Sequence, residues 1–330
     1  MVTKKYKVLG IGNAIMDVVA NVEDNFLKKH NLRKGSMKII DESEVEKLHS
    51  CIRTVKEVSG GSVANTIATL SLLGDRAAFI GKVGNDDLGK SFKKDLKNLG
   101  VRYCVVNAGG DMRTACCIVL TTPDAQRTMN TYLGVSGFLK PEDINEISIS
   151  QSEILYLEGY LFDSGDAKEA FKKAINIAVK AGSRVALTLS DSFCVKRHRK
   201  EFLSIAKGYI DVLFANEEEI LSLFGVKNIE DAVRECSKVG NISVITRSEK
   251  GSVIVSEGKV NNVAARKNDN VVDTTGAGDL YAAGFLHGLA GGMNLETCGK
   301  MGSAVASKVL SQFGARLESS VIELVNKEGF

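Results

Sequence analysis

The stretch at residues 154–189 decides the fold class of this chain. It begins with the apolar run ILYL at residues 154–157, continues with DAKEAFKKAINIAVKA at 166–181, and ends with VALTL at 185–189. The two short runs predict buried β-strands, and the segment between them has the periodicity of an amphipathic helix. A helix that joins two strands of one sheet makes those strands parallel, so the stretch predicts an α/β fold.

The same alternation extends on both sides. Further strands are predicted at residues 7–9, 77–80, 212–215, 244–246 and 253–255. Amphipathic segments at 87–99, 217–224 and 229–239 predict the helices between them, and residues 277–310 have a helical pattern with no strand. We therefore predict a three-layer αβα core around a mainly parallel sheet.

Two regions, 15–41 and 114–132, break this pattern. Their strand-like runs at 16–22, 37–40, 116–120 and 127–131 are separated by turn residues and not by helices. We predict that both regions form a small β lid over the ligand site. The expected large domain then comprises residues 1–14, 42–113 and 133–330.

Composition limits the classes of partner. A net charge of +3, from 43 basic and 40 acidic residues, predicts no nucleic-acid-binding face, and no apolar run is long enough for a bilayer. Seven cysteines without a CxxC pair indicate reduced thiols, which predicts a cytoplasmic protein. The four histidines show no metal-ligand spacing with one another or with the cysteines.

The segment DTTGAGD at residues 273–279 carries the strongest chemical signal. Two glycines around an alanine let backbone amides gather where a helix starts, which predicts an anion hole at Gly276, Ala277 and Gly278. Asp279 lies in the first turn of an otherwise apolar helix. It is either a base directed at that anion hole or a helix cap.

Two earlier segments predict a site for a hydroxylated substrate. In SGGSVAN at 59–65, Gly60 and Gly61 let the backbone approach a ligand, and Asn65 lies one helical turn further on. GIGNAIMD at 10–17 resembles a dinucleotide fingerprint, but an isoleucine replaces its third glycine and a strand follows it. Asn13 and Asp17 are instead polar residues suited to binding a diol.

Together these segments resemble the ribokinase (PfkB) family of sugar and nucleoside kinases. The Gly-Gly and DTTGAGD segments are similar to the two family signatures, in the same order. The resemblance implies ATP as phosphate donor and Mg²⁺ as cofactor, often with stimulation by a monovalent cation such as K⁺. It also implies Asp279 as the catalytic base, with Asp17, Gly60, Gly61 and Asn65 in the substrate site.

The resemblance extends to the nucleotide site. Asn216 and Glu219 match an NxxE motif that organises magnesium and phosphate, although acidic residues there also suit a helix N-terminus. Thr246 and Gly251 resemble the nucleotide-binding stretch, but Ser248 occupies a place where glycine is common. Arg127, on a predicted lid strand, resembles a basic residue near the transferred phosphates.

Within the family, the chain is most similar to the adenosine kinases. Tyr160 and Phe193 match positions that sandwich a purine, and Met37 matches a lid position; the alternative is that the rings are core aromatics. The resemblance implies phosphorylation of the 5′-hydroxyl of a purine nucleoside, with adenosine as the leading candidate. A kinase for ribose, fructose or a keto-deoxy sugar acid is the first alternative, and a non-catalytic nucleoside or sugar sensor is the second. Both monomer and homodimer are compatible with the sequence.

Overall fold

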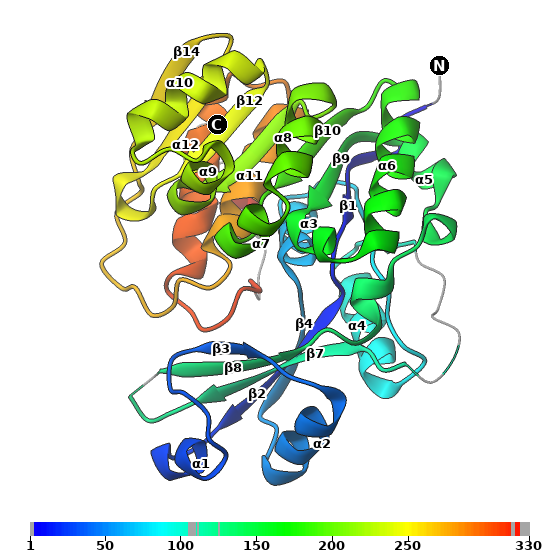
Figure 1. Cartoon of the computed structure of the whole chain (residues 1–330), viewed down its shortest axis with the longest axis vertical. Coiled ribbons are helices and arrows are strands. Elements are labelled where there is room, and N and C mark those ends of the chain that lie inside the picture. The colour runs from blue at the N-terminus through cyan, green and yellow to red at the C-terminus, as the bar shows by residue number, and fades with distance from the viewer. Residues whose placement is uncertain (1–2, 105–109, 111, 125, 318–320, 324–330) are drawn as a thin grey trace.

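The chain forms two β-sheets, described by a computed structural model for residues 3–104, 110, 112–124, 126–317 and 321–323. The larger sheet has the strand order β14-β13-β12-β11-β10-β9-β1-β5-β6, and the smaller has the order β3-β8-β7-β2-β4. All strand pairs from β12 to β6 are parallel, while β13 and β14 are antiparallel additions at one edge. The predicted α/β fold with a mainly parallel sheet is confirmed (Figure 1).

The strands and helices have the following bounds. The large sheet contains β1 (Tyr6–Ile11), β5 (Ala77–Ile80), β6 (Arg102–Tyr103), β9 (Ser152–Glu158), β10 (Arg184–Thr188), β11 (Val212–Asn216), β12 (Ile242–Thr246), β13 (Ser252–Ser256) and β14 (Lys259–Val263). The small sheet contains β2 (Ile15–Asn21), β3 (Met37–Ile39), β4 (Lys56–Gly60), β7 (Ala115–Thr121) and β8 (Arg127–Tyr132). The α-helices are α1 (Asp24–Lys29), α2 (Glu42–Cys51), α3 (Ser62–Leu72), α4 (Asp87–Asn98), α5 (Glu146–Ser150), α6 (Gly165–Lys180), α7 (Ser192–Arg197), α8 (Arg199–Gly208), α9 (Glu217–Phe224), α10 (Ile229–Val239), α11 (Ala277–Ala290) and α12 (Leu295–Val309).

Helices cover both faces of the large sheet and create two apolar cores. On one face, Val8, Phe79 and Phe214 pack against side chains of α3, α4 and α11. On the other face, Leu155 and Leu187 pack against α6 to α10. Successive residues of a strand point to opposite faces of the sheet. Since helices cover both faces, each strand contributes side chains to both cores, and its apolar residues follow one another without polar residues between them.

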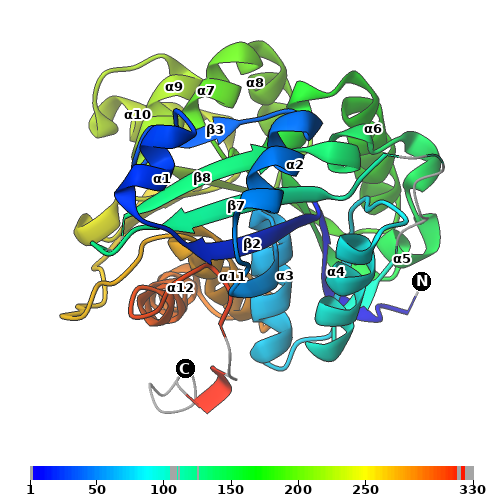
Figure 2. The same ribbon diagram turned by 90° about the horizontal axis from the view of Figure 1, so that it is seen from below.

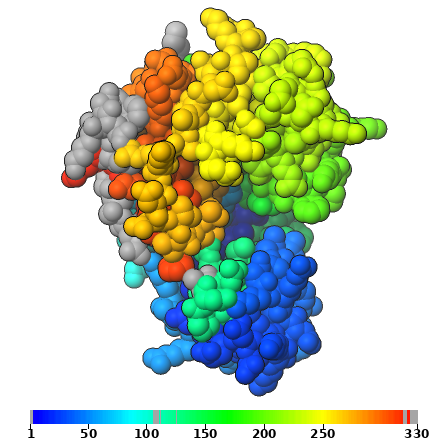
Figure 3. Space-filling model, turned by 90° about the vertical axis from the view of Figure 1, so that its left-hand side faces the viewer, coloured from blue at the N-terminus to red at the C-terminus, as the bar shows by residue number. Residues whose placement is uncertain are grey.

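The small sheet has one covered face and one open face. Met16, Val18 and Ile118 are buried against residues of α1 and α2, such as Leu27 and Leu48. Figure 2 shows these two helices on the outer side of the sheet, away from the large domain. The intervening residues, including Asp17, therefore point toward the large domain. The surface is hollowed where the two parts meet (Figure 3).

The structure departs from the expected division of the chain in one place. Strand β4 pairs with β2 in the small sheet, and α2 packs on that sheet, although both lie in residues 42–113 that we assigned to the large domain. The low apolar content of KEVSG, the sequence of β4, explains why the strand was missed. Among the residues that the structure describes, no helix is long and apolar enough to cross a membrane.

Candidate active site

Asp279 lies in the first turn of α11, where two side chains from α3 hold its carboxylate. The Ser62 hydroxyl donates to Oδ1 at 2.6 Å, and the Asn65 amide donates from Nδ2 to Oδ2 at 2.9 Å. The two bonds come from residues more than 200 positions away in the sequence, so the contact between α3 and α11 builds this part of the site. Asn65, which we assigned to the substrate site, thus lies directly beside Asp279.

The environment of Asp279 suits a proton acceptor. Desolvation raises the pKa of this carboxyl from 3.8 to about 6, while the bonds from Ser62 and Asn65 and the charge of Arg316 act in the opposite direction. A base works best when its pKa lies close to the working pH, because it is then both ionised and basic. At neutral pH Asp279 is ionised and ready to accept a proton.

The backbone before Asp279 forms an open helix N-terminus. Gly276 is the N-cap residue of α11, has a φ of 78°, and provides no side-chain cap. A Cβ on Gly276 would come within 2.4 Å of the Cβ of Ala315, whereas a Cβ on Gly278 would meet nothing within 4 Å. The amides of this turn therefore border free space on one side. Such a turn attracts an anion through its N–H groups and the helix dipole.

Arg316 is a buried cation close to this carboxylate, and no sequence motif marks its role. Its guanidinium donates to the carbonyl oxygen of Ser59 at 2.6 Å and 3.0 Å and to that of Ala64 at 2.9 Å. Burial lowers the pKa of Arg316 to about 10, so the side chain stays charged at neutral pH. Its charge opposes the burial-driven rise in pKa at Asp17 and Asp279.

Asp17 lies on the open face of the small sheet, directly beside the glycine pair. A Cβ on Gly60 would lie 2.8 Å from one carboxylate oxygen of Asp17, so only glycine leaves that carboxylate in place. Burial raises the pKa of Asp17 to about 6, and Arg316 and Arg127 lower it in part. The structure thus brings Asp17, Gly60, Asn65 and Asp279 into one region, as the resemblance implied.

Gly61 is required by both its conformation and its surroundings. Its φ is 98°, and a Cβ there would lie 2.2 Å from the carbonyl oxygen of Asn13. We expect Gly61→Ala to lower the free energy of unfolding by at least about 2 kcal/mol, because left-handed strain adds to a collision with backbone.

Gly182 provides the matched control for this prediction. It has a φ of 67°, but a Cβ there would meet nothing within 4 Å. Urea unfolding of Gly182→Ala should show only the conformational loss, about 1 kcal/mol. Equal losses in the two variants would contradict the assigned collision.

Asn13 and Glu158 form a buried pair behind the glycine segment. The Asn13 amide donates to Oε1 of Glu158 at 2.7 Å, and the Val63 amide donates to Oε2 at 3.0 Å. Burial raises the pKa of Glu158 to about 7. We had not singled out Glu158, since one acidic residue at the end of an apolar strand gives no distinct pattern. Through the bond to the Val63 amide, the pair fixes the start of α3. The side-chain amide of Asn13 therefore bonds to another residue of the protein and not to a ligand.

Arg127 connects the small sheet to the anion-hole loop. Its guanidinium bonds to the carboxylate of Asp273 and to the hydroxyl of Thr275, both in the DTTGAGD segment. Asp273 also accepts from the amides of Thr275 at 2.9 Å and Gly314 at 2.7 Å. Arg127 thus lies beside the predicted phosphate site, and its charge is balanced by Asp273.

Asn216 and Glu219 form the capping box of α9. The Asn216 backbone and side-chain amides donate to the two carboxylate oxygens of Glu219 at 3.0 Å and 2.6 Å. Burial raises the pKa of Glu219 to about 7, and the charges of Asp191, Glu218 and Asp279 raise it further. No ion pair within the described residues neutralises any of these four carboxylates. The unbalanced negative charge suits a divalent cation with oxygen ligands.

Tyr160 and Phe193 are exposed aromatic residues on neighbouring elements. Tyr160 lies in the 3₁₀ helix η3 (Gly159–Asp163) and Phe193 in α7, two elements that contact each other. The side chains are 40% and 65% exposed, which excludes the alternative that they are core aromatics. Burial raises the pKa of Tyr160, and the negative charges of Asp191, Glu158, Glu219 and Asp279 raise it further. Met37 is also exposed, on edge strand β3 of the small sheet.

Thr246 and Gly251 flank a short turn after β12. Ser248, which occupies a position where glycine was expected, has a φ of 52°, so the left-handed backbone is kept without glycine. Gly251 has a φ of 82°, and a Cβ there would lie 2.0 Å from the carbonyl oxygen of Val263. Thr246 is half-buried and donates to the carbonyl of Ala215 at 3.5 Å.

Known proteins resemble the chain over most of its length. A 5-dehydro-2-deoxygluconokinase from Listeria monocytogenes serotype 4b is 28% identical over 268 residues, which cover 78% of this chain and 82% of the relative. Among solved structures, the adenosine kinase from Sinorhizobium meliloti is 42% identical, with a TM-score of 0.90, covering 98% of this chain and 99% of the other. A probable sugar kinase from Rhizobium etli CFN 42 is 40% identical, with a TM-score of 0.91 and 99% of both chains covered.

A more distant structure supports the fold alone. An adenosine kinase from Schistosoma mansoni is 21% identical and has a TM-score of 0.82 over 96% of this chain. The family model of the pfkB family carbohydrate kinases matches residues 6–321. Since this match spans both sheets and both signature segments, the chain belongs to the pfkB family of carbohydrate kinases and is a phosphotransferase that acts on a hydroxyl group of a sugar or a nucleoside.

Proposed function

We propose that the chain transfers the γ-phosphate of ATP to the 5′-hydroxyl of a purine nucleoside, with adenosine as the leading substrate. The observation that carries this proposal is the pair of exposed rings, Tyr160 and Phe193, on two contacting elements whose N-cap residues are the acidic residues Glu158 and Asp191. A flat base stacked on aromatic rings gains roughly 1–3 kcal/mol per base in nucleic-acid binders. A free sugar has no flat face that needs two rings.

Asp279 acts as the general base in this proposal. Its carboxylate accepts the proton of the substrate hydroxyl while that oxygen attacks the γ-phosphorus and the bond to ADP breaks. Ser62 and Asn65 fix the carboxylate by one hydrogen bond to each oxygen. Because these bonds already hold the carboxylate of Asp279 in position, it has to move less when the reaction occurs.

The turn at Gly276–Gly278 receives the charge of the transferring phosphoryl group. Open space beside Gly278 and the uncapped N-terminus of α11 support this role. Arg127 lies next to this turn through its bonds to Asp273 and Thr275 and brings a positive charge from the small sheet. Thr246, Gly251 and Asn216 lie at the ends of neighbouring strands β12, β13 and β11, where we place the rest of ATP.

Kinases of this family use ATP with a divalent metal, and the carboxylates near Glu219 suit Mg²⁺. Glu219, Glu218 and Asp191 would hold the ion, partly through water, because Mg²⁺ keeps several of its waters in protein sites. When bound, the metal neutralises charge on the phosphates. Burial and the charges of Asp191, Glu218 and Asp279 raise the pKa of Glu219 to about 7, so a cation bound there would favour its ionised form.

Asp17 and the glycine pair hold the ribose in this proposal. The Asp17 side chain lies on the face of the small sheet that is directed toward the large domain, and the lack of a side chain at Gly60 leaves its carboxylate in place. A carboxylate accepts from two neighbouring hydroxyls, which suits the 2′- and 3′-positions. Met37, on the open face of the lid sheet, lies where an apolar contact with the base is possible.

A sugar-acid kinase is the second candidate. Relatives such as the Listeria monocytogenes and Bacillus licheniformis 5-dehydro-2-deoxygluconokinases, each 28% identical, favour it. ADP release with ATP and Mg²⁺, in the presence and absence of K⁺, decides between the two. We expect saturation at micromolar adenosine and weak turnover of ribose, fructose and 5-dehydro-2-deoxygluconate; turnover of free sugars alone would exclude the nucleoside proposal.

The two rings provide a second test. Tyr160→Ala and Phe193→Ala should each raise the KM for adenosine by roughly 5- to 150-fold, the equivalent of 1–3 kcal/mol of lost stacking. Steady-state kinetics over a range of adenosine concentrations measure this change. Tyr209→Ala is the matched control, because Tyr209 is 55% exposed and lies at the end of α8. If the ring variants behave like Tyr209→Ala, the rings do not bind the base.

A further inference from the structure

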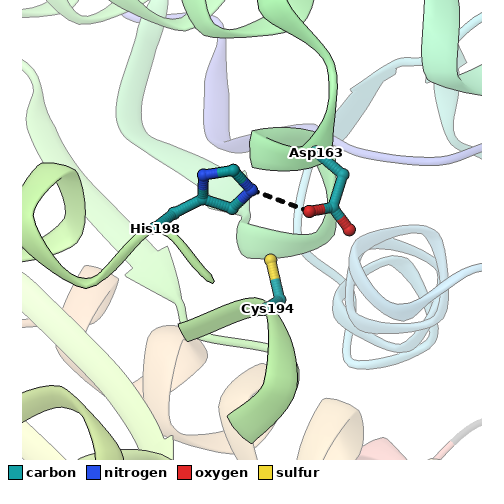
Figure 4. A group of neighbouring side chains, drawn as sticks. All are labelled: Asp163, Cys194 and His198. Carbon is teal, nitrogen blue, oxygen red and sulfur yellow. Dashed lines mark hydrogen bonds and ion pairs between the residues drawn. The ribbon is translucent and has the colours of Figure 1, made fainter. Parts of the chain in front are cut away.

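A second cluster of ligand-type side chains lies behind the aromatic pair. The carboxylate of Asp163 ends η3, the thiol of Cys194 lies in α7, and His198 follows at the C-cap of α7 (Figure 4). One ligand atom from each residue lies within 4.8 Å of the other two. Cys194 and His198 are four residues apart, about one helical turn, so our sequence-based statement that no cysteine and histidine share a ligand spacing was wrong for this pair.

His198 is oriented as a metal ligand would be. Its Nε2 lies 2.7 Å from Oδ1 of Asp163, and its Nδ1 lies 3.1 Å from Oε2 of Glu201. A histidine that binds a metal through one ring nitrogen commonly donates from the other to a carboxylate, which fixes the tautomer. Glu201 provides that carboxylate at Nδ1, where the Lys168 ammonium also lies at 3.3 Å, and Nε2 faces Asp163.

We propose that Asp163, Cys194 and His198 bind one Zn²⁺ ion. A set of one oxygen, one sulfur and one nitrogen ligand is typical of zinc, which is usually four-coordinate and takes a water where the protein provides three ligands. Ligand atoms around a tetrahedral zinc lie about 3.3–3.8 Å apart, given bonds of 2.0–2.3 Å. Here Nε2 of His198 and Oδ1 of Asp163 lie 2.7 Å apart, and all three ligand atoms lie within 4.8 Å of one another, a range that includes this spacing.

Two groups of the cluster carry protons in this structure, the Cys194 thiol and the pair of His198 with Asp163. The Cys194 thiol donates to the carbonyl of Gly159 at 3.4 Å, and burial raises its pKa to about 12. Zinc binding releases this proton and the one shared by His198 and Asp163, because thiolate, neutral imidazole and carboxylate are the binding forms. Arg197 bonds to both carboxylate oxygens of Asp163 at 3.1 Å and 2.6 Å, and Lys168 bonds to Glu201 at 2.9 Å. These cations orient the two carboxylates from outside the cluster.

The position of the cluster between η3 and α7 indicates a structural role for the bound ion. Asp163 belongs to η3, whereas Cys194 and His198 belong to the segment of α7, so one ion would join the two elements. The polar links between them in this structure include the pair of His198 with Asp163, the bond from the Cys194 thiol to the carbonyl of Gly159, and the ion pair of Arg197 with Asp163, whose side chains are about half exposed. Exposed ion pairs contribute little to stability. Zinc would therefore stabilise this contact.

Metal titration of the purified protein tests the proposal. Added Co²⁺ should reach one equivalent per chain and produce a near-ultraviolet thiolate-to-cobalt band and the intense visible bands of tetrahedral cobalt, both of which Zn²⁺ should displace. Equilibrium dialysis should give one bound Zn²⁺, and the unfolding temperature should rise with Zn²⁺ concentration. Cys194→Ser should remove the thiolate band, and Asp163→Ala and His198→Ala should each weaken Zn²⁺ binding at least tenfold.

Cys51→Ser is the matched control, because Cys51 is an exposed free thiol outside the cluster. It should keep the band, the stoichiometry and the affinity of the unaltered protein. Asp163→Ala keeps the proposal testable should Cys194→Ser fail to fold, since Asp163 is largely exposed. The absence of a thiolate band in the unaltered protein, or its loss in Cys51→Ser alone, would overturn the proposal.

Discussion

Replacing Asp279 by asparagine should lower kcat by at least about a hundredfold. Loss of a general base typically removes a factor of 10²–10⁴, and the asparagine amide cannot take the proton of the substrate hydroxyl. Asparagine has the same shape and can still accept the bond that Ser62 donates at 2.6 Å. Its amide nitrogen cannot accept the bond that Asn65 donates to Oδ2, so the Asn65 amide has to turn over and accept through its own unpartnered Oδ1. Rapid-quench measurement of ADP formation at saturating ATP and acceptor tests this expectation.

The pH dependence of the unaltered enzyme provides the control. The base works in its ionised form, so kcat/KM should fall as the pH drops through about 6, the raised pKa of Asp279. In Asp279→Asn the residual rate should lose the part of this acid limb that Asp279 contributes, while Asp17, whose pKa is also raised to about 6, still titrates in this range. A variant that keeps both full turnover and the limb would remove Asp279 from the mechanism.

The same substitution should leave the fold at least as stable as before. The folded protein raises the pKa of Asp279 from 3.8 to about 6, so it binds the proton more tightly than the unfolded chain does. Stability from this group is fully present below the unfolded pKa and is lost as the pH rises through the folded pKa. At pH 7 to 8 the ionised carboxylate therefore destabilises the fold by up to about 3 kcal/mol, which Asn relieves. Thermal unfolding of both proteins at pH 8 measures this change. An unfolding temperature of Asp279→Asn at or above that of the unaltered protein would show that its low kcat does not come from misfolding.

Replacing Arg316 by methionine should have the largest effect on stability. The guanidinium satisfies the buried carbonyl oxygens of Ser59 and Ala64 and lies among the carboxylates of Asp17, Asp95 and Asp279. Methionine fills much of the volume but donates no hydrogen bond. Removal of one partner from a buried charge network costs about 3–5 kcal/mol, and urea unfolding should show a loss of this size.

Arg316→Lys separates the charge of this side chain from its geometry. Lysine keeps the positive charge but has no planar fork to reach both carbonyls, so part of the stability should be lost. Since the charge of Arg316 lowers the pKa of Asp279, the acid limb should stay near 6 in Arg316→Lys and move to higher pH in Arg316→Met. Unchanged stability in Arg316→Met would contradict the role of this side chain as the link between the glycine segment and the base.

Local patterns were sufficient to predict the frame of the protein. Strand β5 and helices α9 and α10 lie at the predicted residues, because apolar periodicity and capping residues such as Asn216 are local signals. Strand β4 was missed, since its sequence KEVSG is polar and its strand pairing is with β2, some 40 residues away. A strand that is stabilised by pairing with a distant strand need not have a recognisable pattern in its own sequence.

The site was predictable where a motif carries its own geometry. Gly276 and Gly61 signal their backbone conformations in the sequence itself, and the structure gives both a positive φ. Arg316 and Glu158 were not predictable, because each acts through backbone groups that only the folded chain brings near. The same holds for Asp163, which meets Cys194 and His198 through the packing of η3 on α7.

Identification of the product tests the central claim most directly. The purified protein is incubated with ATP, Mg²⁺ and adenosine, and the phosphorylated product is examined by phosphorus NMR. We predict a phosphomonoester coupled to the two 5′-methylene protons of the nucleoside, formed by the unaltered protein and almost absent with Asp279→Asn. No phosphomonoester from adenosine, with phosphate transferred in parallel incubations to free sugars alone, or equal product from both proteins, would contradict the account.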